Sequence, residues 1–80
     1  MYTVYVLYSD KFTRTYTGFT SNIERRIKEH NSGKNRYTKA FMPWEIIYSE
    51  PYPDYSTARK REKYLKSAAG KRFLKKSLSN

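Results

Sequence analysis

Five side chains in this sequence could take part in chemistry, and they lie in four separate segments. They are Tyr5, Tyr16, Arg26, His30 and Glu62. A tyrosine hydroxyl can orient or deprotonate water, and a carboxylate can hold a hard divalent cation. A guanidinium can lay its aliphatic stem along apolar surface and still reach a groove. If folding brings these groups to one groove, they would form an active site, so the elements that carry them must be identified.

Glu62 carries the strongest individual signal. It is the one carboxylate in the run Arg59-Lys60-Arg61-Glu62-Lys63, and at about 100° per residue it shares a helix face with Ala58 and Leu65. Burying an unpaired carboxylate costs several kcal/mol, so this side chain needs a cation, a hydrogen-bond cluster or a metal. Two interpretations stay open: an ion pair with a nearby arginine, or a ligand for a cation such as Mg²⁺, which often keeps most of its waters.

The helix expected before residue 31 carries the arginine and the histidine. On a helical wheel Arg26 and His30 flank the apolar face made by Ile23 and Ile27, while Arg25 points to water. This pattern favours Arg26 over Arg25 as the cation that reaches a groove. The alternatives are a salt bridge at the rim for Arg26 and an ordinary hydrogen bond at the core edge for His30.

The tyrosines are harder to interpret one by one. The chain contains nine of them, and tyrosine packs well both in cores and at surfaces. A tyrosine that acts as a base needs neighbouring cations, because its ordinary pKa is about 10. The sequence does not fix the register of the hairpin that carries Tyr5 and Tyr16, so their convergence stays open at this stage.

The distribution of residue types predicts a small α/β (α+β) sandwich. Strands are expected at residues 2–9, 15–19 and 44–49, where β-branched and aromatic residues concentrate. Helices are expected from about 22 to 31, 56 to 67 and 71 to 78. The order ββαβα(α) predicts a single domain over residues 1–80, in which helices flank a three-stranded, mainly antiparallel sheet.

Local signals mark the boundaries of these elements. Ser21 and Glu24 fit a capping box, which predicts Ser21 as the N-cap of the first helix. Pro51 and Pro53 are expected to break the chain after the third strand, and Gly70 to interrupt the last helical stretch. Gly18, inside the second strand, indicates a bend or a close approach of backbone.

Size and charge narrow the function. An 80-residue chain buries only about 60% of its unfolded surface, so its core must be compact and rich in aromatic residues. Seventeen lysines and arginines against seven acidic residues give a net charge of +10. Such a charge attracts nucleic acid first and anionic membrane second. A basic ribosomal-type protein would show the same balance.

The absence of cysteine and the single histidine exclude other classes of site. Without cysteine the chain forms no disulfide or thiolate metal site. Because it has one histidine, we do not expect a zinc finger or a histidine-rich metal nuclease. The sequence also lacks the pattern of a signal peptide and any 18-residue apolar run. We therefore expect a cytoplasmic chain that does not associate with membrane.

Taken in order, these residues resemble the signature of the GIY-YIG nuclease superfamily, and the chain looks like a small, single-domain member. Thr3-Val4-Tyr5 keeps the tyrosine of the first motif, and Tyr16-Thr17-Gly18 keeps the tyrosine and the glycine of the second. The segment that follows is close to the superfamily's second block. It places the superfamily's arginine on Arg26 and its His-or-Tyr position on His30.

The resemblance extends to the second helix, where residues 58–63 match the block that holds the metal-binding glutamate, Glu62. It implies hydrolysis of phosphodiester bonds in DNA with one Mg²⁺ or Mn²⁺ ion held by Glu62. Arg26 would bind the phosphate and offset developing charge. One of the two motif tyrosines would orient or deprotonate the attacking water, with His30 assisting, and Gly18 would permit close approach of the backbone.

Two positions depart from the superfamily pattern. A lysine is common directly after the second motif, where this chain has Phe19, and no counterpart of a late asparagine is visible. No separate DNA-binding domain is expected, so targeting would come from the basic loop at 34–43, the second helix, self-association or a protein partner. The side chains expected to contact nucleic acid are Lys34, Arg36, Lys39, Arg59, Lys63 and Lys66.

Two other functions remain as alternatives. One is a nucleic-acid-binding module whose nuclease site is vestigial, in which Glu62 would be sealed into an ion pair with arginine. The other is a basic RNA-associated protein whose tyrosine-rich sheet stacks bases. A largely buried Glu62 with a path to solvent favours the nuclease, whereas aromatic side chains spread over an exposed sheet face favour the RNA-associated protein.

Overall fold

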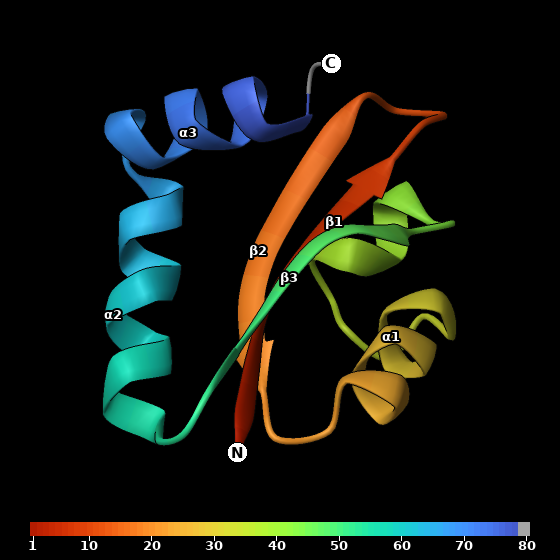
Figure 1. Ribbon diagram of the computed structural model, residues 1–80. Coiled ribbons are helices and arrows are strands. Elements are labelled where there is room, and N and C mark those ends of the chain that lie inside the picture. Colours follow the sequence, from red (N-terminus) through yellow and green to blue (C-terminus); the bar gives the residue numbers. More distant parts are fainter. Residues whose placement is uncertain (79–80) are drawn as a thin grey trace.

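The computed structural model describes residues 1–78 and contains a three-stranded sheet with helices on both of its faces (Figure 1). In chain order the elements are β1 (Tyr2–Ser9), β2 (Arg14–Thr20), α1 (Ile23–Asn31), the short 3₁₀ helix η1 (Thr38–Phe41), β3 (Glu45–Tyr52), α2 (Tyr55–Lys66) and α3 (Ala68–Leu78). This order confirms the predicted α+β class and the predicted ββαβα(α) succession. None of the helices within residues 1–78 is long and apolar enough to cross a membrane.

The central strand β1 pairs with both other strands, and both pairings are antiparallel. The strand order β2-β1-β3 leaves β2 and β3 as the two edges of the sheet. In the β1–β2 ladder, Tyr5 lies opposite Gly18 and Leu7 lies opposite Tyr16. This register places Tyr5, Tyr16 and Gly18 on one face, because side chains alternate between the faces of a strand.

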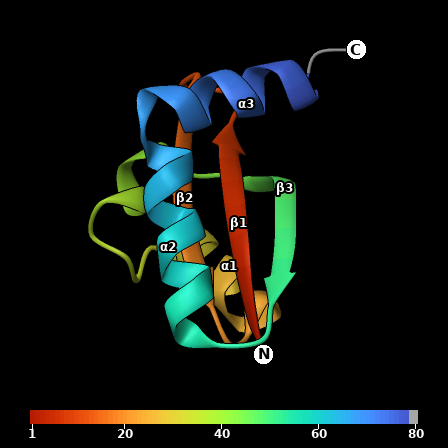
Figure 2. The same cartoon turned by 60° about the vertical axis from the view of Figure 1, so that its left-hand side comes forward.

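Alternation along β1 also builds two separate apolar clusters. Val4 and Val6 point to the face that α2 and α3 cover, where they pack with Ala58 and Leu65. On the other face Tyr5 and Leu7 pack with Trp44, together with half-buried residues of α1. Figure 2 shows α2 running alongside the strands while α3 crosses near their end. The sheet therefore separates the α2 side of the molecule from the α1 side.

Two expectations about the helices need correction. The N-cap of α1 is Asn22 rather than Ser21, because the Asn22 side chain accepts the hydrogen bond from the Arg25 amide, at 3.1 Å. The helical stretch breaks at Ser67, and Gly70 lies inside α3. A Cβ atom at Gly70 would lie only 2.0 Å from the Tyr64 carbonyl oxygen, so this glycine allows α3 to fold tightly against the end of α2.

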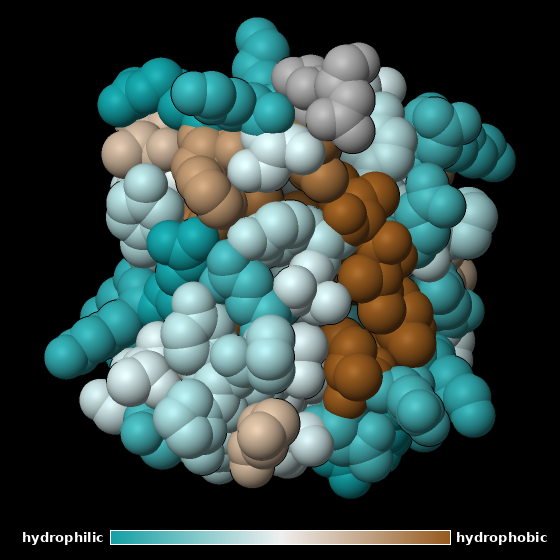
Figure 3. Space-filling view, in the orientation of Figure 1, coloured by the Kyte–Doolittle hydropathy of each residue, from teal (hydrophilic) through white to brown (hydrophobic). Residues whose placement is uncertain are grey.

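The third strand runs further than predicted. It starts at Glu45, after Trp44, and continues through Pro51 to Tyr52. Proline lacks an amide hydrogen, but an edge strand tolerates it because one side of the strand needs no partner. The molecular face in Figure 3 carries a band of apolar side chains bordered by hydrophilic ones, and Ile46 of β3 is 42% exposed.

A partly buried ion pair between Glu50 of β3 and Arg61 of α2 connects the third strand to the two C-terminal helices. The Arg61 guanidinium donates two hydrogen bonds to the Glu50 carboxylate, at 2.8 and 3.0 Å, and its Cζ atom lies 4.8 Å from the Phe73 ring centre. The hydroxyls of Tyr48 and Tyr52 also donate to Glu50. Burial alone would raise the pKa of Glu50, but the bonds from Arg61 and the tyrosines together lower it to about 2.

We predict that Glu50→Gln lowers the free energy of unfolding by about 3 kcal/mol at pH 7, because the folded pKa of about 2 lies below the ordinary 4.5. The wild-type contribution is complete above pH 4.5 and disappears as the pH falls towards 2. Urea titrations across this range measure it, with Glu45→Gln at an exposed position of the same strand as the control. Equal stability of the two variants at pH 7 would contradict the role of this ion pair.

Candidate functional site

The site is centred on Tyr5, whose side chain is 1% exposed in the middle strand of the sheet. A buried phenol needs a hydrogen-bond partner. The Tyr5 hydroxyl finds one in His30 of α1, whose Nε2 atom lies 3.0 Å away. This bond joins the first predicted motif to the helix that follows the second.

His30 is fully buried rather than at the core edge as the helical wheel suggested. Its Nδ1 atom lies 2.9 Å from the Thr38 hydroxyl, so a hydroxyl is available to each ring nitrogen in either neutral tautomer. Burial lowers the pKa of His30, and the positive charge of Arg26 lowers it further. The ring is therefore neutral near pH 7. Thr38 was missed in the sequence because a lone threonine in a basic loop has no distinguishing pattern.

The Tyr5 hydroxyl holds its proton firmly. Burial raises the pKa of Tyr5 to about 12. The interaction with Arg26 opposes this rise, whereas the nearby Tyr16 and Glu62 add to it. The Glu62 charge makes the smallest of these contributions.

Gly18 makes room for this arrangement on β2. A Cβ atom at this position would lie 2.8 Å from the Tyr5 hydroxyl and 3.2 Å from the Tyr16 ring. Both distances are shorter than ordinary van der Waals contact, so any larger residue would displace one of the tyrosines. The close approach expected at Gly18 is thus an approach of tyrosine side chains to the backbone of β2.

Tyr16 lies between the buried centre and the surface. Its ring centre is 4.9 Å from that of His30 and 6.4 Å from that of Tyr5. On the outer side the Tyr37 ring centre lies 6.0 Å away, and Tyr37 is 53% exposed. Of the two motif tyrosines, the half-buried Tyr16 is therefore the one closer to solvent.

Arg26 borders the same group from α1. Its side chain is 36% exposed, whereas that of Arg25 is 68% exposed. The pKa of Arg26 is raised, first of all by its interaction with Tyr5. Its guanidinium also donates to the Glu29 carboxylate at 3.1 Å, so the rim salt bridge considered for Arg26 is present beside the contact with the site.

Glu62 is carried by α2, which packs on the face of the sheet opposite Tyr5. Its side chain is 16% exposed, and its carboxylate lies 3.1 Å from the ammonium of Lys66, which is 53% exposed. The arginine pair expected as the alternative exists on this helix, but it joins Arg61 to Glu50. Glu62 is thus largely buried, and its partner is the exposed ammonium of Lys66, which a bound metal cation could replace.

A metal at this position would have few protein ligands. Within residues 1–78 no three side chains of His, Cys, Asp or Glu lie together as a metal cage. One carboxylate is enough for Mg²⁺ when waters and substrate phosphate complete its octahedron. Glu62 therefore fits one hydrated hard cation and does not fit a tightly held structural metal.

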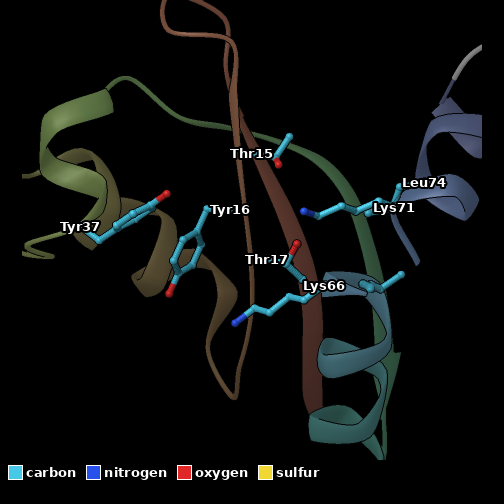
Figure 4. Close-up of a pocket in the computed structure, with 8 residues that line it drawn as sticks. Thr15, Tyr16, Thr17, Tyr37, Lys66, Lys71 and Leu74 are labelled. Atoms are coloured by element: carbon cyan, nitrogen blue, oxygen red, sulfur yellow. The ribbon is translucent and has the colours of Figure 1, made fainter. Parts of the chain in front are cut away.

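A pocket of about 350 Å³ opens beside the edge strand β2. Its lining comes from β2, the loop before η1, α2 and α3: Thr15, Tyr16, Thr17, Tyr37, Leu65, Lys66, Lys71 and Leu74. Figure 4 shows Tyr16 and Tyr37 on one side of β2, and Lys66 and Lys71 extending towards the strand from the other. The pocket therefore brings side chains from both sides of the sheet together at the edge strand β2.

The basic side chains predicted to contact nucleic acid lie in two exposed groups. Lys34, Arg36 and Lys39 are exposed in the loop that leads to and through η1. Arg59 and Lys63 are exposed on α2, and Lys66 lines the pocket at the end of that helix. The two groups belong to opposite sides of the sheet.

The chain is similar in sequence to known proteins. The family model of the GIY-YIG catalytic domain matches residues 1–76. A UPF0213 protein of Syntrophus aciditrophicus is 46% identical over 66 residues, which are 79% of this chain and 74% of that protein. A UPF0213 protein of Natronomonas pharaonis is 42% identical over 53 residues, and the aligned part is 65% of this chain and 62% of that protein.

A solved structure agrees with the fold. The solution NMR structure of a UPF0213 protein from Bacillus halodurans is 35% identical, with a TM-score of 0.54 over 92% of this chain and 82% of that one. The match of the family model covers nearly the whole chain and includes both motifs, α1 and Glu62. The chain therefore belongs to the GIY-YIG catalytic domain family.

Proposed function

We propose that this protein is a metal-dependent endonuclease that hydrolyses phosphodiester bonds in DNA, with RNA as the alternative substrate. Membership of a nuclease family and a net charge of +10 support a nucleic-acid substrate. The observation that carries the proposal is one pocket that Tyr16 lines together with Lys66, whose ammonium contacts Glu62. The Tyr5–His30 pair and Arg26 come from one face of the sheet, and the Glu62–Lys66 pair comes from the other.

In this proposal Glu62 holds one Mg²⁺ or Mn²⁺ ion, which when bound would polarise the phosphate and stabilise the leaving oxygen. Arg26 binds the phosphate and offsets the charge that develops on it. Its rim position between Tyr5 and Glu29 leaves part of the guanidinium exposed to a substrate.

The two motif tyrosines have different roles in this proposal. Tyr16 orients the attacking water, since it lines the accessible pocket. Tyr5 keeps its proton near neutral pH because its pKa is about 12, and its hydrogen bond to neutral His30 fixes the ring beneath Tyr16. The Arg26 charge lowers the pKa of Tyr5, and a cation on Glu62 would act in the same direction.

The two alternatives receive less support. In a vestigial binding module Glu62 would be sealed by arginine, whereas its partner is the half-exposed Lys66. A base-stacking sheet would need an exposed aromatic face, but helices cover both faces here (Figure 1). The more exposed tyrosines, Tyr37, Tyr55 and Tyr64, lie outside the strands. We further propose that self-association or a protein partner directs the enzyme to its target.

A plasmid nicking assay with Mg²⁺ or Mn²⁺ tests the proposal. Wild-type protein should convert supercoiled DNA to the nicked form, and Arg26→Ala should lower the rate by at least about 100-fold, because a phosphate-facing cation contributes several kcal/mol to the transition state. Arg25→Ala serves as the matched control and should alter only salt-sensitive binding. An equal loss of rate in the two variants would rule out the assignment of Arg26.

Metal binding can be followed without substrate by NMR titration. Mg²⁺ or Mn²⁺ should perturb signals of Glu62, Tyr5 and Tyr16 in the wild type, and Glu62→Gln should remove these changes. Because Glu62 pairs with an exposed lysine, the same variant should keep its melting temperature or gain slightly. It should also bind DNA as tightly as the wild type or slightly better. Weak changes spread over the whole surface, or a loss of roughly 3–5 kcal/mol in stability, would favour a purely structural Glu62.

A further inference from the structure

The pocket beside β2 contains charged groups that the proposed reaction does not use. Lys66 belongs to the last turn of α2, and Lys71 belongs to the first turns of α3. Both line the pocket, and Figure 4 shows both side chains directed towards β2. Two ammonium groups that extend into one pocket give it a positive potential, which favours an anion there.

The opposite wall offers hydroxyl groups to the same space. Thr15 and Thr17 are two residues apart on β2, and therefore project from the same face of that strand, towards α2 and α3. A hydroxyl can donate a hydrogen bond to an oxyanion, and an ammonium provides a point charge with three donors. Two hydroxyls facing two ammonium groups form a set of donors that fits the oxygens of a phosphate.

The junction between the helices directs Lys71 into the pocket. The Gly70 amide donates to the Ser67 hydroxyl at 3.2 Å, and the Lys71 amide donates to the Ser67 carbonyl at 2.9 Å. Gly70 is buried against the Tyr64 carbonyl, where no Cβ atom would fit. This tight turn fixes the direction in which α3 leaves α2, and hence the side on which Lys71 emerges.

Lys66 connects this pocket to the proposed metal ligand. Its ammonium contacts the Glu62 carboxylate at 3.1 Å, one helical turn away. Four residues of helix correspond to roughly 6 Å along the axis. At about 3.4 Å of rise per nucleotide, this distance spans one to two nucleotides, so a phosphate held at Lys66 would be a near neighbour of the phosphate bound through the cation on Glu62.

We propose that Lys66 and Lys71, with the hydroxyls of Thr15 and Thr17, form a subsite for a backbone phosphate next to the scissile one. The proposal rests on the nuclease function and specifies how one strand lies across the edge of β2. Lys66 neutralises Glu62 in the free protein and turns to the flanking phosphate when a cation occupies the carboxylate.

Titration of the metal-free, ¹⁵N-labelled protein with inorganic phosphate tests the part of the subsite formed by Lys71, Thr15 and Thr17, because Lys66 pairs with Glu62 in the free protein. We expect saturable shifts of the amide signals of Thr15, Thr17 and Lys71. In Lys71→Gln the apparent affinity of these shifts should fall about fivefold, the size expected when roughly 1 kcal/mol is lost. Lys76→Gln removes the same charge from an exposed position of α3 outside the pocket, and should change the affinity less than twofold.

Nicking under single-turnover conditions separates this inference from the proposed function. Lys71→Gln should raise the DNA concentration that gives half the maximal rate by about fivefold, and change the maximal rate by less than twofold. Equal behaviour of Lys71→Gln and Lys76→Gln in both measurements would overturn the subsite. If the wild type binds phosphate at these residues but nicks no DNA, the subsite stands as an anion site and the nuclease proposal fails.

Discussion

The arrangement of the site depends on the burial of one hydroxyl. Tyr5 is almost inaccessible in the central strand, and its hydroxyl can be satisfied there by His30, which is itself fully buried. His30 in turn needs Thr38 for its second nitrogen. This chain of two hydrogen bonds fixes α1 and the loop at η1 against the sheet. It also accounts for Gly18, because the space that a side chain would fill there is taken by the Tyr5 ring.

The sheet separates the groups that we propose act together. Arg26 and the Tyr5–His30 pair lie on the α1 face, whereas Glu62 is carried by α2 on the opposite face. They meet at one pocket beside the edge strand β2, which Tyr16 lines together with Lys66, the partner of Glu62. In our account the substrate strand lies along this free edge, where both faces are accessible. The Glu50–Arg61 pair holds α2 to β3 and so maintains the position of Glu62.

Much of the fold follows from local patterns, and less of the site does. The strands and helices were predictable because β-branched runs, caps and glycines mark them, although Asn22 caps α1 where Ser21 was expected. The burial of Glu62 followed from helical periodicity. The hydrogen bond between Tyr5 and His30 did not, because it depends on hairpin register and on helix packing across 25 residues. The same is true of the pairing of Arg61 with Glu50, which are 11 residues apart in different elements.

The central claim is that groups from the two faces of the sheet act as one site. Nicking rates of Arg26→Lys, Glu62→Asp and the variant with both changes test it most directly, since these conservative changes should leave a measurable rate. Residues that act as a unit have strongly non-additive effects. We therefore predict that the double variant is no more than a few-fold slower than the slower single variant. A rate reduced by the product of the two single effects would show that Arg26 and Glu62 act independently, and would contradict the account.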